Sequence, residues 1–161
     1  MTRTTAGRRI VVGVDGSDAA VAAVLWAVRE ALLRHAIVHL VYAYQSDSTP
    51  RAPYASWSWL TRQDERYAVA RTQLSATAEL ARRQLPDGQL MTELADEPPA
   101  RALLDRAADA EMLVLGTTRP VREPGQPVHA MGPVARACLR LAHCPVVVVN
   151  PGDQPAPRAR A

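Results

Sequence analysis

The sequence predicts a single α/β domain built on a parallel sheet. Short β-branched runs alternate with longer segments of helical periodicity, and turn-forming glycine, aspartate or proline separates them. This alternation implies right-handed crossovers with helices on both faces of the sheet. At 161 residues, 48% of them apolar, the chain has room for one ordinary core. We expect a domain over 8–150, a flexible terminus over 1–7 and a disordered tail over 151–161, which is rich in proline and arginine.

The first half of the domain is expected to hold two strands and two helices. Residues 10–14 form a short strand, Ser17 or Asp18 caps a helix that continues to about residue 34, and 37–44 form a second strand. The apolar positions of that helix are Val21, Val24, Leu25, Val28 and Leu32. A polar connection over 45–58 follows. The next helix begins near residue 61 and ends at residues 86–88. Its apolar positions are Tyr67, Ala70, Leu74, Ala78, Ala81 and Leu85.

Trp57 and Trp59 lie at the end of that connection. Aromatic side chains on a loop either anchor it to the domain or form a lid or a patch for a partner. We favour anchoring.

The second half is expected to hold three strands and two helices. Alternation over 90–94 indicates a strand near an edge, and a helix opens at Pro98 or Pro99. Residues 112–116 and 146–149 are strands. The helix between these last two opens at Pro133, and its inward positions are Val134, Ala137, Cys138 and Leu141.

Composition argues against several classes of partner. The net charge is +3 and the pI about 9.3, but all 19 basic residues are arginines, dispersed among acidic residues, so no basic stripe for nucleic acid forms. No apolar run approaches the roughly 18 residues of a membrane span, and the first nine residues lack the apolar core of a signal peptide. We expect a cytoplasmic protein with neither a nucleic-acid nor a membrane partner.

Motifs for catalysis and for metal binding are missing from the sequence. GxxxxGK[ST], GxGxxG, GxSxG and HExxH do not occur. Cys138 and Cys144 form no CxxC and are expected to be reduced, packed thiols. Nothing in their spacing pairs Ser17 with His129 as nucleophile and base. We therefore expect no catalytic residues, no metal site and no enzyme.

Two connections stand out as candidates for ligand binding. Asp15-Gly16-Ser17 follows the first strand, and a long proline-containing loop joins Gly116 to Gly132. A connection of that length is usually functional or disordered, and we favour a functional one. Open α/β sheets place phosphate-bearing ligands where strands end and helices begin. The Asp-Gly-Ser sequence is equally a good turn in any protein.

The two ends of the chain resemble the universal stress protein family. The resemblance covers 9–150 and is carried by Val14-Asp15-Gly16-Ser17 and by His143-Cys-Pro-Val-Val-Val-Val149, with the glycine-bounded loop between them. It implies a Rossmann-like, open five-stranded sheet in the order 3-2-1-4-5 with four helices on both faces. Strands 1 and 4 would then be neighbours, and the two connections would meet where the strand order reverses. The resemblance also implies that Asp15 contacts the nucleoside of ATP and that Ala43 flanks adenine. Val14 and Val134 would lie beside them.

The family's phosphate motif, G-x2-G-x9-G-[ST], is altered here. Gly116 matches its first glycine, Arg119 replaces the second, twelve residues precede Gly132, and Pro133 replaces the hydroxyl residue. A guanidinium at Arg119 can pair with phosphate oxygens, whereas Pro133 supplies neither a hydroxyl nor an N–H. Two interpretations stay open: ATP, with magnesium, bound through a rearranged loop, or a fold that has lost its nucleotide.

The last strand suggests a dimer edge made of Val146, Val147, Val148 and Val149. Unpaired backbone and apolar side chains favour pairing, and the resemblance implies a two-fold homodimer. The expected function is that of a regulatory or binding protein in the stress response, sensing adenine nucleotide in the cleft between strands 1 and 4. The alternative is a dimeric protein-interaction module with an unknown regulatory partner and no nucleotide. Weak ATP hydrolysis would have only Asp15 to support it.

Overall fold

The computed structural model describes residues 8–45, 56–117 and 131–151, and side chains throughout these ranges except over 56–64. The described residues form five strands and four helices, and strands and helices alternate along the chain. In chain order the elements are β1 (Arg9–Val14), α1 (Asp18–Arg34), β2 (Ile37–Ala43), α2 (Ser56–Arg82), β3 (Leu90–Ala95), α3 (Pro99–Ala107), β4 (Met112–Gly116), α4 (Pro133–Leu141) and β5 (Val146–Val149).

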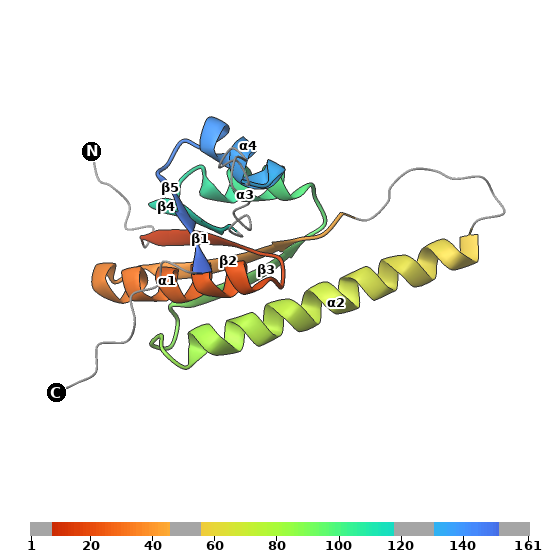
Figure 1. The fold of residues 1–161 in the computed structure, drawn as a ribbon. Coiled ribbons are helices and arrows are strands. Elements are labelled where there is room, and N and C mark those ends of the chain that lie inside the picture. Colours follow the sequence, from red (N-terminus) through yellow and green to blue (C-terminus); the bar gives the residue numbers. More distant parts are fainter. Residues whose placement is uncertain (1–7, 46–55, 118–130, 152–161) are drawn as a thin grey trace, which may run out of the picture.

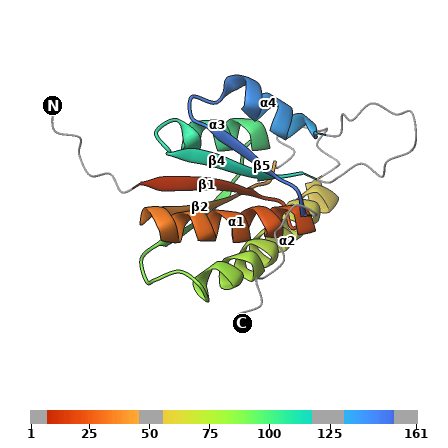
Figure 2. The same cartoon turned by 60° about the vertical axis from the view of Figure 1, so that its left-hand side comes forward.

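All five strands are parallel and lie in one sheet in the order β3-β2-β1-β4-β5. Helices α1 and α2 cover one face, and α3 and α4 cover the other (Figure 1). The turned view in Figure 2 shows the same three layers, with the sheet between the two pairs of helices. The expected fold class and strand order are confirmed, and the order reverses between β1 and β4.

Two buried clusters of side chains, one on each face, hold the layers together. Ile10 and Val12 of β1 face α1 and α2, whereas Val11 of the same strand faces α3 and α4. A strand that is buried on both faces must be apolar at every position, which explains the continuous β-branched run. With β2 and β4 beside it, β1 is the centre of the core.

Helix α1 packs through alanines rather than through its largest side chains. Ala20, Ala23 and Ala27 are buried with Val24, whereas the predicted inward residue Leu32 is 41% exposed. The prediction from apolar spacing was therefore wrong for the last turn of this helix. Small side chains let the helix axis approach the sheet closely, so alanines make up most of the buried face of α1. A prediction from hydrophobic periodicity gives alanine little weight and therefore favours the larger residues.

Helix α2 begins at Ser56, five residues before the predicted start. Trp57 and Trp59 therefore belong to a helix, and the prediction that they lie on a loop is wrong. Their side chains are not among those that the structure describes. At 27 residues, α2 is about 40 Å long, and it runs past the end of the sheet (Figure 1). Tyr67, predicted to be inward, is consequently 44% exposed and meets Tyr44 edge to face, with ring centroids 5.8 Å apart.

Helix α4 opens at Pro133 as predicted, but one of its inward positions was assigned wrongly. Ala135 and Cys138 are buried, whereas Leu141 is 60% exposed. The helix packs mainly on α3 and touches β5 little, so its last turn has no neighbour to cover it within the described residues. Leu139 and Leu141 are therefore exposed apolar side chains in the last turn of α4.

The two edge strands are β3 and β5, as expected. Cys138 is a buried free thiol and Cys144 a partly exposed one. Apart from Pro151, the predicted terminal segments lie outside the described residues, as does the part of the loop that carries Arg119, so the domain boundaries stay predictions.

Candidate functional site

A cleft of about 400 Å³ opens at the carboxyl ends of β1 and β4, where the strand order reverses. The two connections singled out in the sequence meet there, since Ser17 and Gly132 line the same cleft. Six of the seven predicted binding residues also line it. They are Val14, Asp15, Ala43, Gly116, Gly132 and Val134. The seventh, Arg119, lies outside the described residues.

In the β1–α1 turn, hydrogen bonds from Ser17 fix the orientation of the Asp15 carboxylate. Asp15 Oδ1 accepts hydrogen bonds from the backbone N–H of Ser17 at 3.0 Å and from Ser17 Oγ at 2.5 Å. Ser17 Oγ in turn accepts from Ala20 N at 3.1 Å, which caps α1. The Asp15 side chain is exposed, and its Oδ2 accepts no hydrogen bond within the described residues. This oxygen is available to a ligand hydroxyl.

Gly16 completes the turn with φ of 80°, a conformation that favours glycine. The carboxamide of Gln73, from α2, lies where a Cβ of residue 16 would be. Tyr42 Oη donates to Gln73 Oε1 at 2.6 Å, and burial, followed by the charge of Asp15, raises the pKa of this tyrosine. Helix α2 thus supports the turn from the face opposite the cleft.

The floor of the cleft is apolar and includes residues that the sequence did not single out. Pro99 and Leu103 of α3 line it together with Val41 and Leu115. Gly13 makes the floor open, because a Cβ there would lie 2.8 Å from Leu115 Cδ2 and 3.1 Å from Leu103 Cδ1. The contribution of α3 could have been anticipated, since its proline start follows a strand whose carboxyl end shares the same sheet edge.

The two motif glycines differ in what surrounds them. A Cβ on Gly116 would overlap the backbone carbonyl of Ala19 and lie 2.8 Å from Ala20 N. A Cβ on Gly132 would meet nothing within 4 Å, and its φ is −59°. Gly116 is therefore required for β4 to pack against α1, whereas the described structure places no such demand on Gly132.

The amino end of α4 forms one wall of the cleft and has no side-chain cap. Pro133 lacks an N–H, and the first bond within the helix runs from Arg136 N to Gly132 O at 3.1 Å. The N–H groups of Val134 and Ala135 consequently have no intrahelical acceptor. An anion would find these two donors and the positive end of the helix dipole. None of the described residues lining the cleft is basic.

Over the described ranges, no three or more His, Cys, Asp or Glu side chains cluster in a way that could hold a metal ion. The same part of the chain contains no helix long and apolar enough to cross a membrane.

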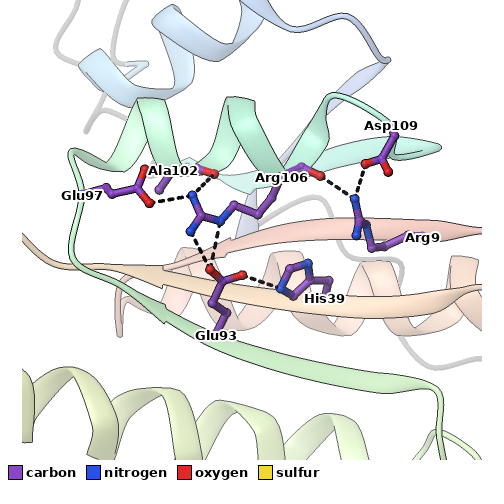
Figure 3. Close-up of polar contacts among 7 residues, drawn as sticks. All are labelled: Arg9, His39, Glu93, Glu97, Ala102, Arg106 and Asp109. Carbon is purple, nitrogen blue, oxygen red and sulfur yellow. Dashed lines mark hydrogen bonds and ion pairs between the residues drawn. The ribbon is translucent and has the colours of Figure 1, made fainter.

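A second polar cluster joins α3 to the sheet (Figure 3). Arg106 of α3 donates to Glu93 Oε1 at 2.6 Å and 3.0 Å, and to Glu97 Oε1 at 3.0 Å. At the far end of α3, Arg9 of β1 pairs with Asp109. These bonds position the helix whose first turn forms part of the cleft.

His39 of β2 is the buried member of this cluster, at 4% exposure. Its Nε2 lies 3.0 Å from Glu93 Oε2, while Nδ1 is buried without a partner among the described residues. Burial lowers the pKa of His39, opposed by the charge of Glu93 and aided by the charges of Arg9 and Arg106. The Arg106 hydrogen bonds lower the pKa of Glu93. The imidazole is therefore neutral near pH 7 and serves packing rather than chemistry.

Comparison with known proteins agrees on one family. Residues 7–150 match the model described as the universal stress protein family. Universal stress protein Rv2623 of Mycobacterium tuberculosis is 31% identical over 150 residues, which are 92% of this chain and 49% of that protein. The chain thus spans about half the length of the curated relatives it matches.

Solved structures share the same architecture. UspA from Lactobacillus plantarum has a TM-score of 0.71 at 23% identity, covering 88% of this chain and 97% of that one. The universal stress protein of Archaeoglobus fulgidus in complex with dAMP has a TM-score of 0.64 at 24% identity, covering 88% and 97%. At these identities the likeness concerns the fold.

Proposed function

The chain belongs to the universal stress protein family, and on that premise we propose that it is a regulatory binding protein of the stress response that senses an adenine nucleotide. The observation that carries the proposal is the single cleft in which Asp15, Ala43 and Gly132 meet from three separate segments. A structural neighbour of the same fold was solved with dAMP. Because nucleotides are intracellular metabolites, the proposal places the protein in the cytoplasm.

Each part of a nucleotide has a counterpart in the cleft. The exposed carboxylate of Asp15 would accept hydrogen bonds from ribose hydroxyls through Oδ2, which is free of partners in the described chain. The apolar floor, with Ala43 at the end of β2, would take the base. The N–H groups of Val134 and Ala135 would receive phosphate oxygens. Arg119 would add a cation for the phosphates, and magnesium would accompany ATP.

The proposed role is binding rather than catalysis. Hydrolysis needs a base that activates water, and among the described residues lining the cleft Asp15 is the one titratable carboxylate, oriented by Ser17. We assign the protein a regulatory function with no efficient enzyme activity.

Thermal shift and calorimetry with AMP and with ATP, each with and without magnesium, test the proposal. We expect a rise in Tm at millimolar nucleotide and a loss of about tenfold or more in affinity for Asp15→Ala, since hydrogen bonds to a charged group contribute about 1.5–3 kcal/mol. Asp18→Ala is the matched control, because this carboxylate is exposed one turn away and does not line the cleft. No shift for the wild type, or equal binding by Asp15→Ala, would refute nucleotide sensing in this cleft.

A second candidate function is a dimeric protein-interaction module without nucleotide. The absence of a basic residue among the described cleft residues and the proline at position 133 favour it. Both functions include a homodimer through β5, where three of four valines are only partly buried and Leu141 is exposed nearby.

Sedimentation tests the dimer. Val147→Arg should give a monomer, because an arginine on this edge would lose its hydration in the interface. Leu33→Arg, on α1 at a position 76% exposed, should leave the mass unchanged. An unaltered mass for Val147→Arg would exclude the β5 edge.

A further inference from the structure

The sheet has a second open edge, at β3, and its backbone geometry can be read from two bonds. Val38 N donates to Gln89 O and Tyr44 N donates to Ala95 O, both at 2.9 Å. In a parallel ladder every second residue of a strand bonds to the same neighbour. The odd-numbered residues of β3 therefore direct their backbone groups toward β2.

The even-numbered residues direct theirs the other way. The backbone N–H and C=O groups of Leu90, Thr92 and Leu94 point to the outer edge, and none of them has a backbone partner within the described part of the chain. An open edge of this kind is a template for another strand.

Beside this edge lies a groove of about 210 Å³ between β3 and the flank of α2. Thr92 and Leu94 form its strand side. Arg71, Ser75 and Arg82 lie on the α2 side, along one stripe of the helix. Small side chains occupy the middle of the stripe and an arginine stands at each end, so the groove is narrow, partly apolar and basic at both ends.

The distance between Arg71 and Arg82 indicates which side chains a strand bound in this groove would need. Arg71 and Arg82 are eleven positions apart in the helix, which places their Cα atoms about 16 Å apart along its axis. Along an extended strand, side chains on the same face repeat about every 6.7 Å, so two residues four apart are about 13 Å apart, within reach of flexible arginines. Arg71 is exposed, and Arg82 makes only a loose contact of 3.6 Å with exposed Glu79. Acidic side chains at positions i and i+4 match this arrangement.

We propose that the β3 edge binds an extended acidic segment of a partner protein, which adds to the sheet as a sixth strand. Its backbone pairs with Leu90, Thr92 and Leu94, its two acidic residues meet Arg71 and Arg82, and a small residue midway between them lies over Ser75. This surface is separate from the nucleotide cleft, with which it shares no lining residue.

A second copy of β3 fits the edge poorly. The one acidic residue of this strand is Glu93, whose side chain faces α3 and is engaged by Arg106 and His39. Pairing of two β3 strands would therefore put no carboxylate against the α2 arginines. Charge complementarity selects a different chain.

Fluorescence anisotropy with a labelled peptide tests the proposal. The peptide is Thr-Glu-Val-Ser-Val-Glu-Thr, in which glutamates at positions i and i+4 flank a serine. We expect saturable binding that falls at least tenfold when both glutamates become lysine, and at least tenfold when alternate backbone amides are N-methylated. The first change removes charge pairing and the second removes strand pairing.

Protein variants provide the matched control. Arg82→Glu should weaken peptide binding at least tenfold, whereas Arg83→Glu, at the residue that directly follows α2 and lies outside the groove, should not. Thr92→Pro removes one outward N–H at an edge position that tolerates proline and should also weaken binding tenfold with the far-UV spectrum unchanged.

Several results would overturn the proposal: no binding at millimolar peptide, equal binding of the lysine or the N-methylated peptide, equal effects of Arg82→Glu and Arg83→Glu, or displacement of the peptide by oligothymidylate at equal charge. The last would mean a general anion surface. Self-association through this edge would appear as a lower mass of the Thr92→Pro variant than of the wild type, and would overturn the proposal in favour of a second copy.

Discussion

Gly116 and Gly132 match the first and the last glycine of the phosphate motif, but replacing each by alanine should have different effects on stability. Gly116 lies where β4 meets the first turn of α1, and a methyl group there would overlap the Ala19 carbonyl. Because that neighbour is helix backbone and not a flexible side-chain end, relief requires α1 to shift. Gly132 has open space around its Cα and a φ of −59°, which alanine adopts without strain.

The expected magnitudes differ clearly. Overpacking of a core contact costs about 1–3 kcal/mol, and a backbone neighbour puts Gly116→Ala near 3 kcal/mol. A gain of about 0.4–1 kcal/mol from the stiffer unfolded chain offsets part of this, leaving a loss of about 2 kcal/mol in the free energy of unfolding. For Gly132→Ala, the same gain is opposed by a slightly poorer N-cap, so we expect a change within about 0.5 kcal/mol.

Urea denaturation followed by far-UV circular dichroism measures both variants against the wild type. At about 2–4 °C per kcal/mol for a chain of this size, Gly116→Ala should also lower Tm by about 4–8 °C. Equal stability of the two variants, or a Gly116→Ala protein as stable as the wild type, would refute the packing argument. Because Gly132→Ala should leave stability unchanged, any loss of nucleotide affinity in this variant would reflect a change in the binding site and not partial unfolding.

Three further outcomes follow from single groups. Ser17→Ala should lower the free energy of unfolding by about 1 kcal/mol in urea denaturation, because the Ser17 Oγ cap on Ala20 N is lost. Gly88→Ala should cost about 1 kcal/mol in the same assay through backbone conformation alone, since φ is 83° and no atom lies within 4 Å of the new Cβ; an unchanged midpoint would contradict this. Burial lowers the pKa of His39 from 6.5, so the unfolded state binds more protons just below that pH. The free energy of unfolding should therefore fall as pH drops from 6.5 toward the lower pKa that His39 has in the folded state. His39→Gln should remove this pH dependence. The loss of stability that comes from protonating Glu93 appears only below the pKa of 4.5 that this carboxyl has in the unfolded state.

The elements that could be predicted from the sequence are those whose signals are local. β-branched runs, the Ser17 cap, the proline starts of α3 and α4 and the alternation of β3 depend on neighbours in the chain. The motif resemblance added the strand order, and the structure confirms it. The predictions that failed, at Leu32, Tyr67 and Leu141, concern which residue of a helix finds a partner.

The candidate site divides in the same way. The sequence by itself determined the chemistry that Asp15, Gly16 and Ser17 can offer, because a turn and its cap are made within a few residues. Only the tertiary structure decided that Gly116 serves helix packing, that α3 contributes to the floor of the cleft, and that β3 leaves an edge beside two arginines. These features arise between segments distant in the chain, where close approach is set by side-chain volume and layer geometry rather than by local pattern.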